Sequence, residues 1–187
     1  MPSPVGHVIA GVAAGWLVAG SPRVTGIAPF KVPGTFVREA MVFGALAALP
    51  DIDLLVGAHS GPTHSLGVAL VVGILAGLAQ RIRLRRPGTV GPSPLVLAVA
   101  CSAAYASHAL LDWLGTDTSP PIGIMALWPF SAAHYESNLH VFMAVSRRYY
   151  HGWVFVRHNA LALVRELVIL VPILMVTILF RSRTRSR

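Results

Sequence analysis

The sequence is short of charged residues. Only 12% of its 187 residues are charged, whereas a soluble domain carries about 25%. Hydrophobic residues make up 55% of the chain, and the mean hydropathy is +0.66. So few charges would not cover the surface of a soluble protein of this length, which indicates an integral membrane protein. The length predicts a single domain over residues 1–187.

Cysteine and acidic residues are also scarce. Cys101 is the only cysteine, which excludes an internal disulfide and a cysteine-rich zinc site, and we expect it to be a small core residue. Seven acidic residues face 15 basic ones, for a formal net charge of +8. Such a basic chain can bind nucleic acid. Here, however, the basic residues form short runs between apolar segments, as topology signals do, and we expect no nucleic-acid partner.

Five apolar segments predict an all-α membrane bundle. They cover residues 4–20, 36–49, 65–80, 95–114 and 161–180. A full span needs about 20 apolar residues. The fourth and fifth segments reach this length, whereas the first three reach it only with their polar ends. Some helices of the bundle are therefore not required to span fully.

Small and polar residues mark helix ends and helix contacts. Ser3 and Ser65 are candidate N-caps of the first and third segments. Glycines spaced four apart allow close helix packing in lipid. They occur as Gly11 with Gly15 and as Gly73 with Gly77.

A polar and aromatic stretch separates the last two segments. Residues 113–160 hold three of the four Trp and three of the four Tyr. Aromatic side chains with polar tips favour the membrane–water interface, so we predict an interfacial cap with one or two short helices. Arg147 and Arg148 in this cap are candidates to bind a lipid phosphate, or lie on a solvated face.

The basic residues predict the membrane topology. If all five segments cross, one side receives most of the Lys and Arg: Arg23, Lys31, Arg38, Arg81, Arg83, Arg85, Arg86, Arg181, Arg183, Arg185 and Arg187. The positive-inside rule places this side, with the C-terminus, in the cytoplasm. We therefore expect a multi-pass protein of the cytoplasmic (inner) membrane.

Carboxylates and imidazoles gather at the opposite, extracytoplasmic ends of the segments. The candidate metal ligands are His7, Asp51, Asp53, His59, His64, His108 and Asp112. Ionisable groups at membrane depth need partners, and no Lys or Arg stands within these motifs. Nitrogen and oxygen ligands without thiolates suit Zn²⁺ first, with Mn²⁺ or Fe²⁺ as alternatives. So many ligands make two ions plausible.

Each motif alone has a plainer explanation. His108 and Asp112, spaced i and i+4, share one helix face and could be a hydrogen-bonded packing pair. Asp51 and Asp53 after Pro50 could finish a helix as an Asx turn. If they belong to the site, one ligates or acts as general base, and the other ligates a second ion or orients a histidine.

Two other polar groups are weaker candidates. Glu166 is either a ligand or an ion-pair partner of its neighbour Arg165, and we favour the pair. His134, Glu136 and His140 in the cap could hold another ion, but we expect ordinary loop residues.

An ordered set of motifs resembles one family. S-P-V-G-H, L-P-D-I-D, H-S-G-P-T-H-S, S-H-A-L-L-D and L-W-P-F-S follow one another between residues 3 and 131. This set resembles the YdjM-like family of membrane-bound metal-dependent hydrolases. In the family's H-R-G-x-T-H-S, Arg is replaced here by Ser60.

A more distant similarity is to zinc-dependent phospholipase C and P1-type nucleases. These all-helical enzymes order an early His, an Asp followed about a dozen residues later by a His, and then H-x-x-x-D. Here His7, Asp51, His64, His108 and Asp112 match that order. The resemblance implies a phospholipase C-like core. The H-x-x-x-E of the phospholipases is absent, so a third metal is not implied.

We therefore expect a metal-dependent hydrolase, and first a phosphoesterase acting on a lipid or lipid-linked phosphate. Asp51 or Asp53 would serve as general base for an activated water. An amide or ester hydrolase, or a non-enzymatic membrane protein with a structural metal, are the alternatives.

Overall fold

The computed structural model describes residues 1–19, 34–56, 60–146 and 149–184. Five α-helices dominate this part of the chain, and it has no strand beyond two isolated β-bridges. The helices are α1 (Pro4–Ala19), α2 (Gly34–Ala48), α3 (Leu66–Leu84), α4 (Pro94–Leu114) and α5 (Trp153–Thr184). Three short 3-10 helices join them: η1 (Leu49–Val56), η2 (Pro62–His64) and η3 (Tyr149–His151). The predicted all-α class is confirmed.

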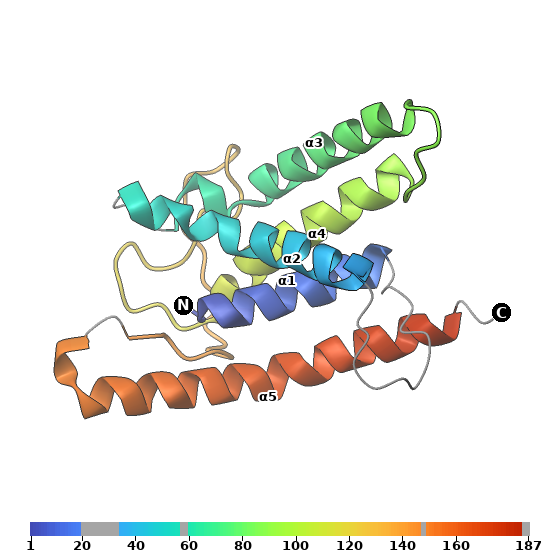
Figure 1. Ribbon diagram of the computed structural model, residues 1–187. Helices are drawn as coiled ribbons and strands as arrows, with labels where there is room; N and C mark the ends of the chain where they lie inside the picture. Colours follow the sequence, from blue (N-terminus) through green and yellow to red (C-terminus); the bar gives the residue numbers. More distant parts are fainter. Residues whose placement is uncertain (20–33, 57–59, 147–148, 185–187) are drawn as a thin grey trace.

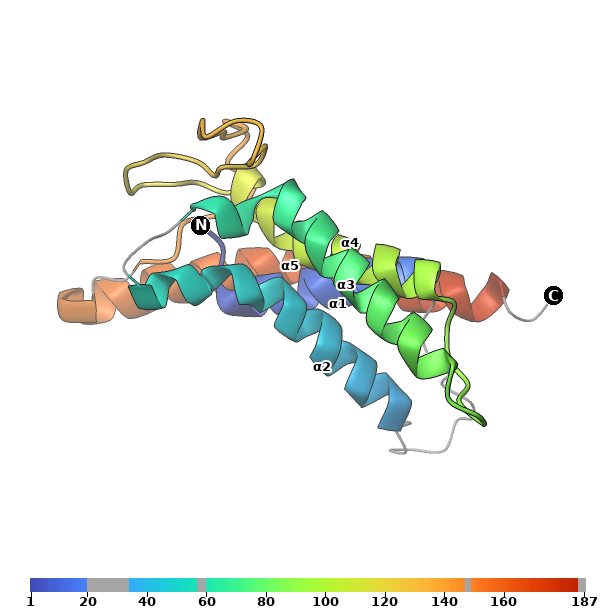
Figure 2. The same ribbon diagram turned by 90° about the horizontal axis from the view of Figure 1, so that it is seen from above.

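The helices alternate in direction along the bundle (Figures 1 and 2). The starts of α1, α3 and α5 and the ends of α2 and α4 therefore lie at one end, together with η1, η2 and the loop after α4. The turn between α3 and α4 and the end of α5 lie at the other. This arrangement gathers the candidate ligands at one end of the molecule and the run from Arg81 to Arg86 at the opposite end.

Three helices are long and apolar enough to cross a membrane: α3, α4 and the part of α5 from Trp153 to Leu179. Helix α1 is a shorter apolar helix, with 16 residues. Helix α3 exceeds its predicted length because it continues one turn through Arg81 and Arg83, whose side chains lie beyond the apolar part of the helix. The outward faces are apolar, as at Leu70, which is 60% exposed, and Val168, which is 67% exposed. Such faces suit contact with lipid.

Helix α1 lies at the centre and contacts α2, α4 and α5. A core of Trp16, Phe43 and Ala104 joins α1, α2 and α4, and Cys101 packs in the same core as expected. A Cβ atom on Gly11 would collide with Ala47 of α2, and one on Gly73 would collide with Ser102 of α4. The predicted close contacts at the glycine pairs are confirmed, because only a missing side chain lets these backbones approach.

The N-cap predictions are also confirmed. Ser3 Oγ accepts from the N–H of Gly6, at 3.1 Å, and Ser65 Oγ accepts from the N–H of Val68, at 3.1 Å. Each hydroxyl satisfies one of the N–H groups that a helix leaves unpaired at its start.

The stretch predicted as a cap is largely irregular. Helix α4 ends at Leu114 and α5 begins at Trp153, so both helices extend into residues 113–160. Of the described residues between them, only η3 is helical. Helix α5 starts earlier than its apolar segment because the polar residues Arg157, His158 and Asn159 occupy its first turns.

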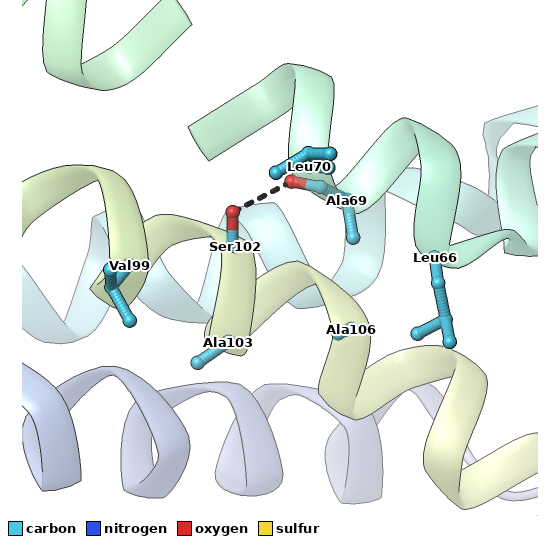
Figure 3. Close-up of a pocket in the computed structure, with 7 residues that line it drawn as sticks. All are labelled: Leu66, Ala69, Leu70, Val99, Ser102, Ala103 and Ala106. Carbon is cyan, nitrogen blue, oxygen red and sulfur yellow. Dashed lines mark hydrogen bonds between the residues drawn. The ribbon is translucent and has the colours of Figure 1, made fainter. Parts of the chain in front are cut away.

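An apolar groove follows the outer side of α3 and α4 (Figure 3). Leu66 and Leu70 of α3 and Val99 of α4 line it, and Ser102 Oγ donates to the main-chain oxygen of Ala69, at 3.0 Å, between the two helices. No candidate ligand lines this groove. It is a feature of the apolar surface and separate from the polar cluster.

Candidate metal centre

Six predicted site residues converge at one end of the bundle. They are His7 of α1, Asp51 and Asp53 of η1, His64 of η2, and His108 and Asp112 of α4. Five of them are at least nine-tenths buried. The exception is Asp51, whose side chain keeps 24% of its accessible surface. Asp51 is therefore the residue of the cluster that is most accessible to solvent.

His108 and Asp112 form the first part of the site. Their helical spacing places both on one face, and His108 Nε2 lies 3.0 Å from Asp112 Oδ2. His7 stacks on His108 with ring centroids 3.8 Å apart, and its Nε2 lies 3.4 Å from Asp112 Oδ1. The first turn of α1 and the last two turns of α4 thus build one cluster.

Pro50 shapes the second part. Proline lacks an N–H and its ring clashes with the preceding turn of an α-helix, so α2 ends at Ala48 and the chain continues as the 3-10 helix η1. With three residues per turn, Asp51 and Asp53 point in directions about 120° apart around η1. Asp51 Oδ1 lies 3.7 Å from His108 Nε2 and 3.8 Å from His64 Nε2.

Asp53 contacts the other nitrogen of His64. Its Oδ2 lies 3.3 Å from His64 Nδ1 and accepts a hydrogen bond from Thr63 Oγ1, at 3.0 Å. His64 Nε2 lies 3.5 Å from Asp112 Oδ2. A carboxylate on the far nitrogen of a metal-binding histidine fixes the tautomer and the ring orientation. The contacts of Asp53 match this orienting role.

Two supporting residues were not singled out from the sequence. Thr63 bonds to Asp53, and Tyr105 Oη donates to the main-chain oxygen of Thr63, at 2.8 Å, which ties η2 to α4. Tyr105 precedes His108 by three residues and so shares its helix face. The spacing of Tyr105 and His108 could have identified Tyr105 from the sequence. The contact of Thr63 with Asp53 could not be identified in this way, because it depends on the conformation of η2.

The protonation of His108 is constrained by the backbone. Its Nδ1 lies 2.7 Å from the main-chain oxygen of Ala47, so Nδ1 carries the proton and donates. The neutral ring therefore presents a lone pair at Nε2. That nitrogen and both carboxyl oxygens of Asp112 are buried and make no hydrogen bond. Leaving such atoms without partners costs about 1–3 kcal/mol each, so the cluster requires additional protons or a bound cation.

Two overlapping groups in the described chain have the geometry to hold a metal ion. One is His7, His108 and Asp112, and the other is Asp51, His64 and His108; within each group the ligand atoms lie within 4.8 Å of one another. The nitrogen and oxygen donors suit Zn²⁺, Mn²⁺ or Fe²⁺. Because His108 has only Nε2 left to offer, it can serve one ion at a time. Two ions, each with a full group of three, do not fit these residues.

Electrostatics keep Asp51 ready to act as an anion. Burial alone would raise the pKa of its carboxyl group. The imidazoles of His64, His108 and His7 outweigh burial and hold this pKa below its ordinary value. Asp51 is thus held in its anionic form, in which it can ligate a cation.

Four predicted residues remain. Three of them, His59, Arg147 and Arg148, lie outside the described residues, and the fourth is Glu166. Glu166 accepts hydrogen bonds from Ser3, while Arg165 donates to the main-chain oxygen of His140, at 3.0 Å. The favoured pairing of Glu166 with Arg165 is therefore wrong, because the two side chains point away from α5 in different directions, one to Ser3 and the other to His140.

Comparison with known protein families assigns the chain to one of them. The family model described as "YdjM inner membrane protein" matches residues 1–184. No curated protein and no solved structure matches the chain, so the similarity to phospholipase C and P1 nuclease stays a prediction. The match covers the helical bundle and every residue of the polar cluster, and the chain therefore belongs to the YdjM inner membrane protein family.

Proposed function

We propose that this chain is a membrane-embedded, metal-dependent hydrolase, and specifically a phosphoesterase that acts on a lipid or lipid-linked phosphate. One observation carries the proposal. His108 Nε2 and both carboxyl oxygens of Asp112 are buried side by side without hydrogen bonds. A hydrolytic metal site needs such anionic and lone-pair donors, held in place before the ion binds.

The residues divide into ligands and supports. His7, His108 and Asp112 would hold a divalent ion, and His64 and Asp51 stand close enough to complete or exchange its ligands. When bound, such an ion lowers the pKa of water and polarises a phosphoryl or carbonyl oxygen.

Asp51 is the residue we assign as general base. It is the one carboxylate of the cluster with substantial exposure, and it faces His64 and His108. From there it can take a proton from water that enters the site and keep it near the reacting oxygen. Asp53 is assigned to holding His64 and not to proton transfer, since it is buried behind that ring.

The residues around the partly exposed Asp51 support a lipid substrate. Leu49 and Ile52 flank Asp51 on η1 and are 44% and 53% exposed. Trp153, the first residue of α5 at the same end, is 76% exposed, and Phe130 in the loop after α4 is 96% exposed. Exposed apolar and aromatic residues beside a polar opening suit the boundary between acyl chains and headgroups.

The charge distribution supports one orientation. Most of the Lys and Arg that the structure describes lie at the end opposite the cluster, on the start of α2, the end of α3 and the end of α5. We therefore propose that the site faces the extracytoplasmic side and the C-terminus the cytoplasm. A reporter fused to the C-terminus tests this. If a reporter enzyme that works only outside the cytoplasm were active when fused to the C-terminus, this orientation would be contradicted.

Metal analysis of the purified protein tests the function first. We expect about one tightly bound zinc, manganese or iron per chain, because His108 can serve one ion at a time. Protein that stays metal-free after loading with zinc or manganese would overturn the proposal. The loaded protein is then assayed on lipid phosphates and on acyl esters and amides. Turnover confined to acyl substrates would replace the phosphoesterase with an ester or amide hydrolase.

A further inference from the structure

Glu166 is a fully buried acid that the proposed chemistry does not use. It lies in α5 with 0% of its surface exposed. Its Oε1 accepts from the N–H of Ser3, at 2.7 Å, and its Oε2 accepts from Ser3 Oγ. Both oxygens are therefore engaged by one residue that lies 163 positions earlier in the chain.

Ser3 passes this contact on to the first turn of α1. Its Oγ accepts from the N–H of Gly6, at 3.1 Å, and its main-chain oxygen accepts from the N–H of His7, at 3.1 Å. The residue held by Glu166 thus holds the backbone of His7. Since His7 comes four residues after Ser3, a shift of this turn moves the imidazole with it.

The packing leaves little freedom at this point. A Cβ atom on Gly6 would stand 2.6 Å from Glu166 Oε2, so glycine lets α1 approach the carboxyl group closely. Among the α-helices of the described chain, α5 packs against α1, and Figure 1 shows it running alongside that helix. The contact with Ser3 therefore fixes where the start of α1 lies along α5.

We propose that Glu166 is a positioning residue for the metal centre: through Ser3 it sets the place of His7 opposite His108 and Asp112. This inference rests on the proposed metal centre, but it adds a residue from a helix that supplies no ligand. It explains why an apolar helix keeps a buried acid, which is costly in a membrane protein unless every oxygen is satisfied.

The test uses Glu166→Gln in the full chain, purified in detergent. Glutamine keeps the shape but removes the negative charge and places an NH₂ donor where one carboxyl oxygen accepts, so the Ser3 hydroxyl loses its acceptor at that position and both hydrogen bonds lose their charge assistance. The matched control is Thr177→Val. Thr177 is also buried in α5, but its hydroxyl donates to Ile173 within the same helix.

Metal binding is measured with Co²⁺, whose visible absorption reports its ligands. We expect Glu166→Gln to weaken Co²⁺ affinity about tenfold, the lower end for residues that support a ligand, and to change the absorption spectrum. Thr177→Val should change neither. In a His7→Ala background, Glu166→Gln should have no further effect on affinity, because the ligand that it positions is gone.

A second measurement separates this inference from the metal centre itself. In metal-free protein, Glu166→Gln should speed hydrogen exchange of the amides of Gly6 and His7 and leave those of α4 unchanged. Equal weakening of Co²⁺ binding with and without His7, or unchanged exchange in the first turn of α1, would overturn the positioning role. If the wild-type chain bound no Co²⁺, the metal centre would fail, and the exchange result alone would decide whether Glu166 holds this turn.

Discussion

Two clusters of histidine and acid lie near the same end of the molecule, and only one has the properties of a metal centre. In the buried cluster, His108 and Asp112 are 0% and 2% exposed and their facing atoms make no hydrogen bond. In the loop after α4, His140 Nδ1 lies 4.0 Å from Glu136 Oε1, but the His140 side chain is 51% exposed.

The loop cluster is satisfied without a cation. Glu136 Oε1 accepts from the N–H of Asp117, at 3.1 Å, and water can solvate the exposed ring of His140. In this loop the same residue types therefore have partners or solvent, and their being ordinary loop residues stays a prediction. What distinguishes the buried cluster is that the facing atoms of His108 and Asp112 are shielded from solvent and need an additional proton or a cation between them.

The two clusters should differ most in how the loss of one side chain changes the affinity for metal. Asp112→Asn removes a carboxylate that lies beside both His7 and His108. We expect the affinity for Zn²⁺ to fall by more than about 100-fold, beyond the range for supporting residues. His140→Asn should leave the affinity unchanged. Isothermal titration of the metal-free proteins measures both.

Folding must be checked in the same experiment. If Asp112→Asn stayed folded and bound Zn²⁺ as the wild type does, the buried cluster would not be the metal centre. If it lost metal and fold together and no substrate were turned over by the wild type, the ion would be structural.

Metal removal should lower stability next. An ion present at 100 times its dissociation constant adds about 2.7 kcal/mol to the free energy of unfolding, if the unfolded chain does not bind it. We expect the thermal midpoint in detergent to fall on chelation in the wild type and in His140→Asn. If the thermal midpoint of the wild type did not change on chelation or on reloading with metal, the buried cluster would not be a site that needs a cation.

Asp53→Asn tests the support of His64. Asparagine can still contact Thr63 and His64, but it loses the charge that orients the ring. We expect metal affinity to fall about 10- to 100-fold. Glu136→Gln is the matched change in the loop cluster and should have no effect. Equal affinities for Asp53→Asn and the wild type would show that Asp53 is not needed to orient His64.

Tyr105→Phe should have the smallest effect. It removes the hydrogen bond to the main-chain oxygen of Thr63 and leaves the ring packed. We expect a loss of about 1 kcal/mol in the free energy of unfolding and a change in metal affinity smaller than that of Asp53→Asn. Chemical denaturation of the metal-free protein measures the first quantity. A larger loss of affinity than for Asp53→Asn would reverse the assigned importance of these two supports.

Much of the fold was predictable because lipid-facing helices leave strong local signals. Hydropathy located all five helices, whereas residue type and spacing predicted the Ser3 and Ser65 caps and the glycine pairs. The bounds of α3 and α5 were missed because both helices continue past the apolar part into polar residues. Hydropathy detects contact with lipid, whereas a helix ends where its hydrogen bonding and capping end.

The sequence by itself determined which side chains were available to a metal, since i, i+4 spacing puts His108 and Asp112 on one face and Pro50 ends α2 before Asp51. Only the tertiary structure decided their roles. In the structure, Asp53 contacts Nδ1 of His64, and Nδ1 of His108 donates to the main-chain oxygen of Ala47. Glu166 accepts hydrogen bonds from Ser3 instead of pairing with Arg165. The physical reason is that helical periodicity is a local property of the chain. Which nitrogen or oxygen is left without a partner, in contrast, depends on backbone and side chains brought together from distant positions.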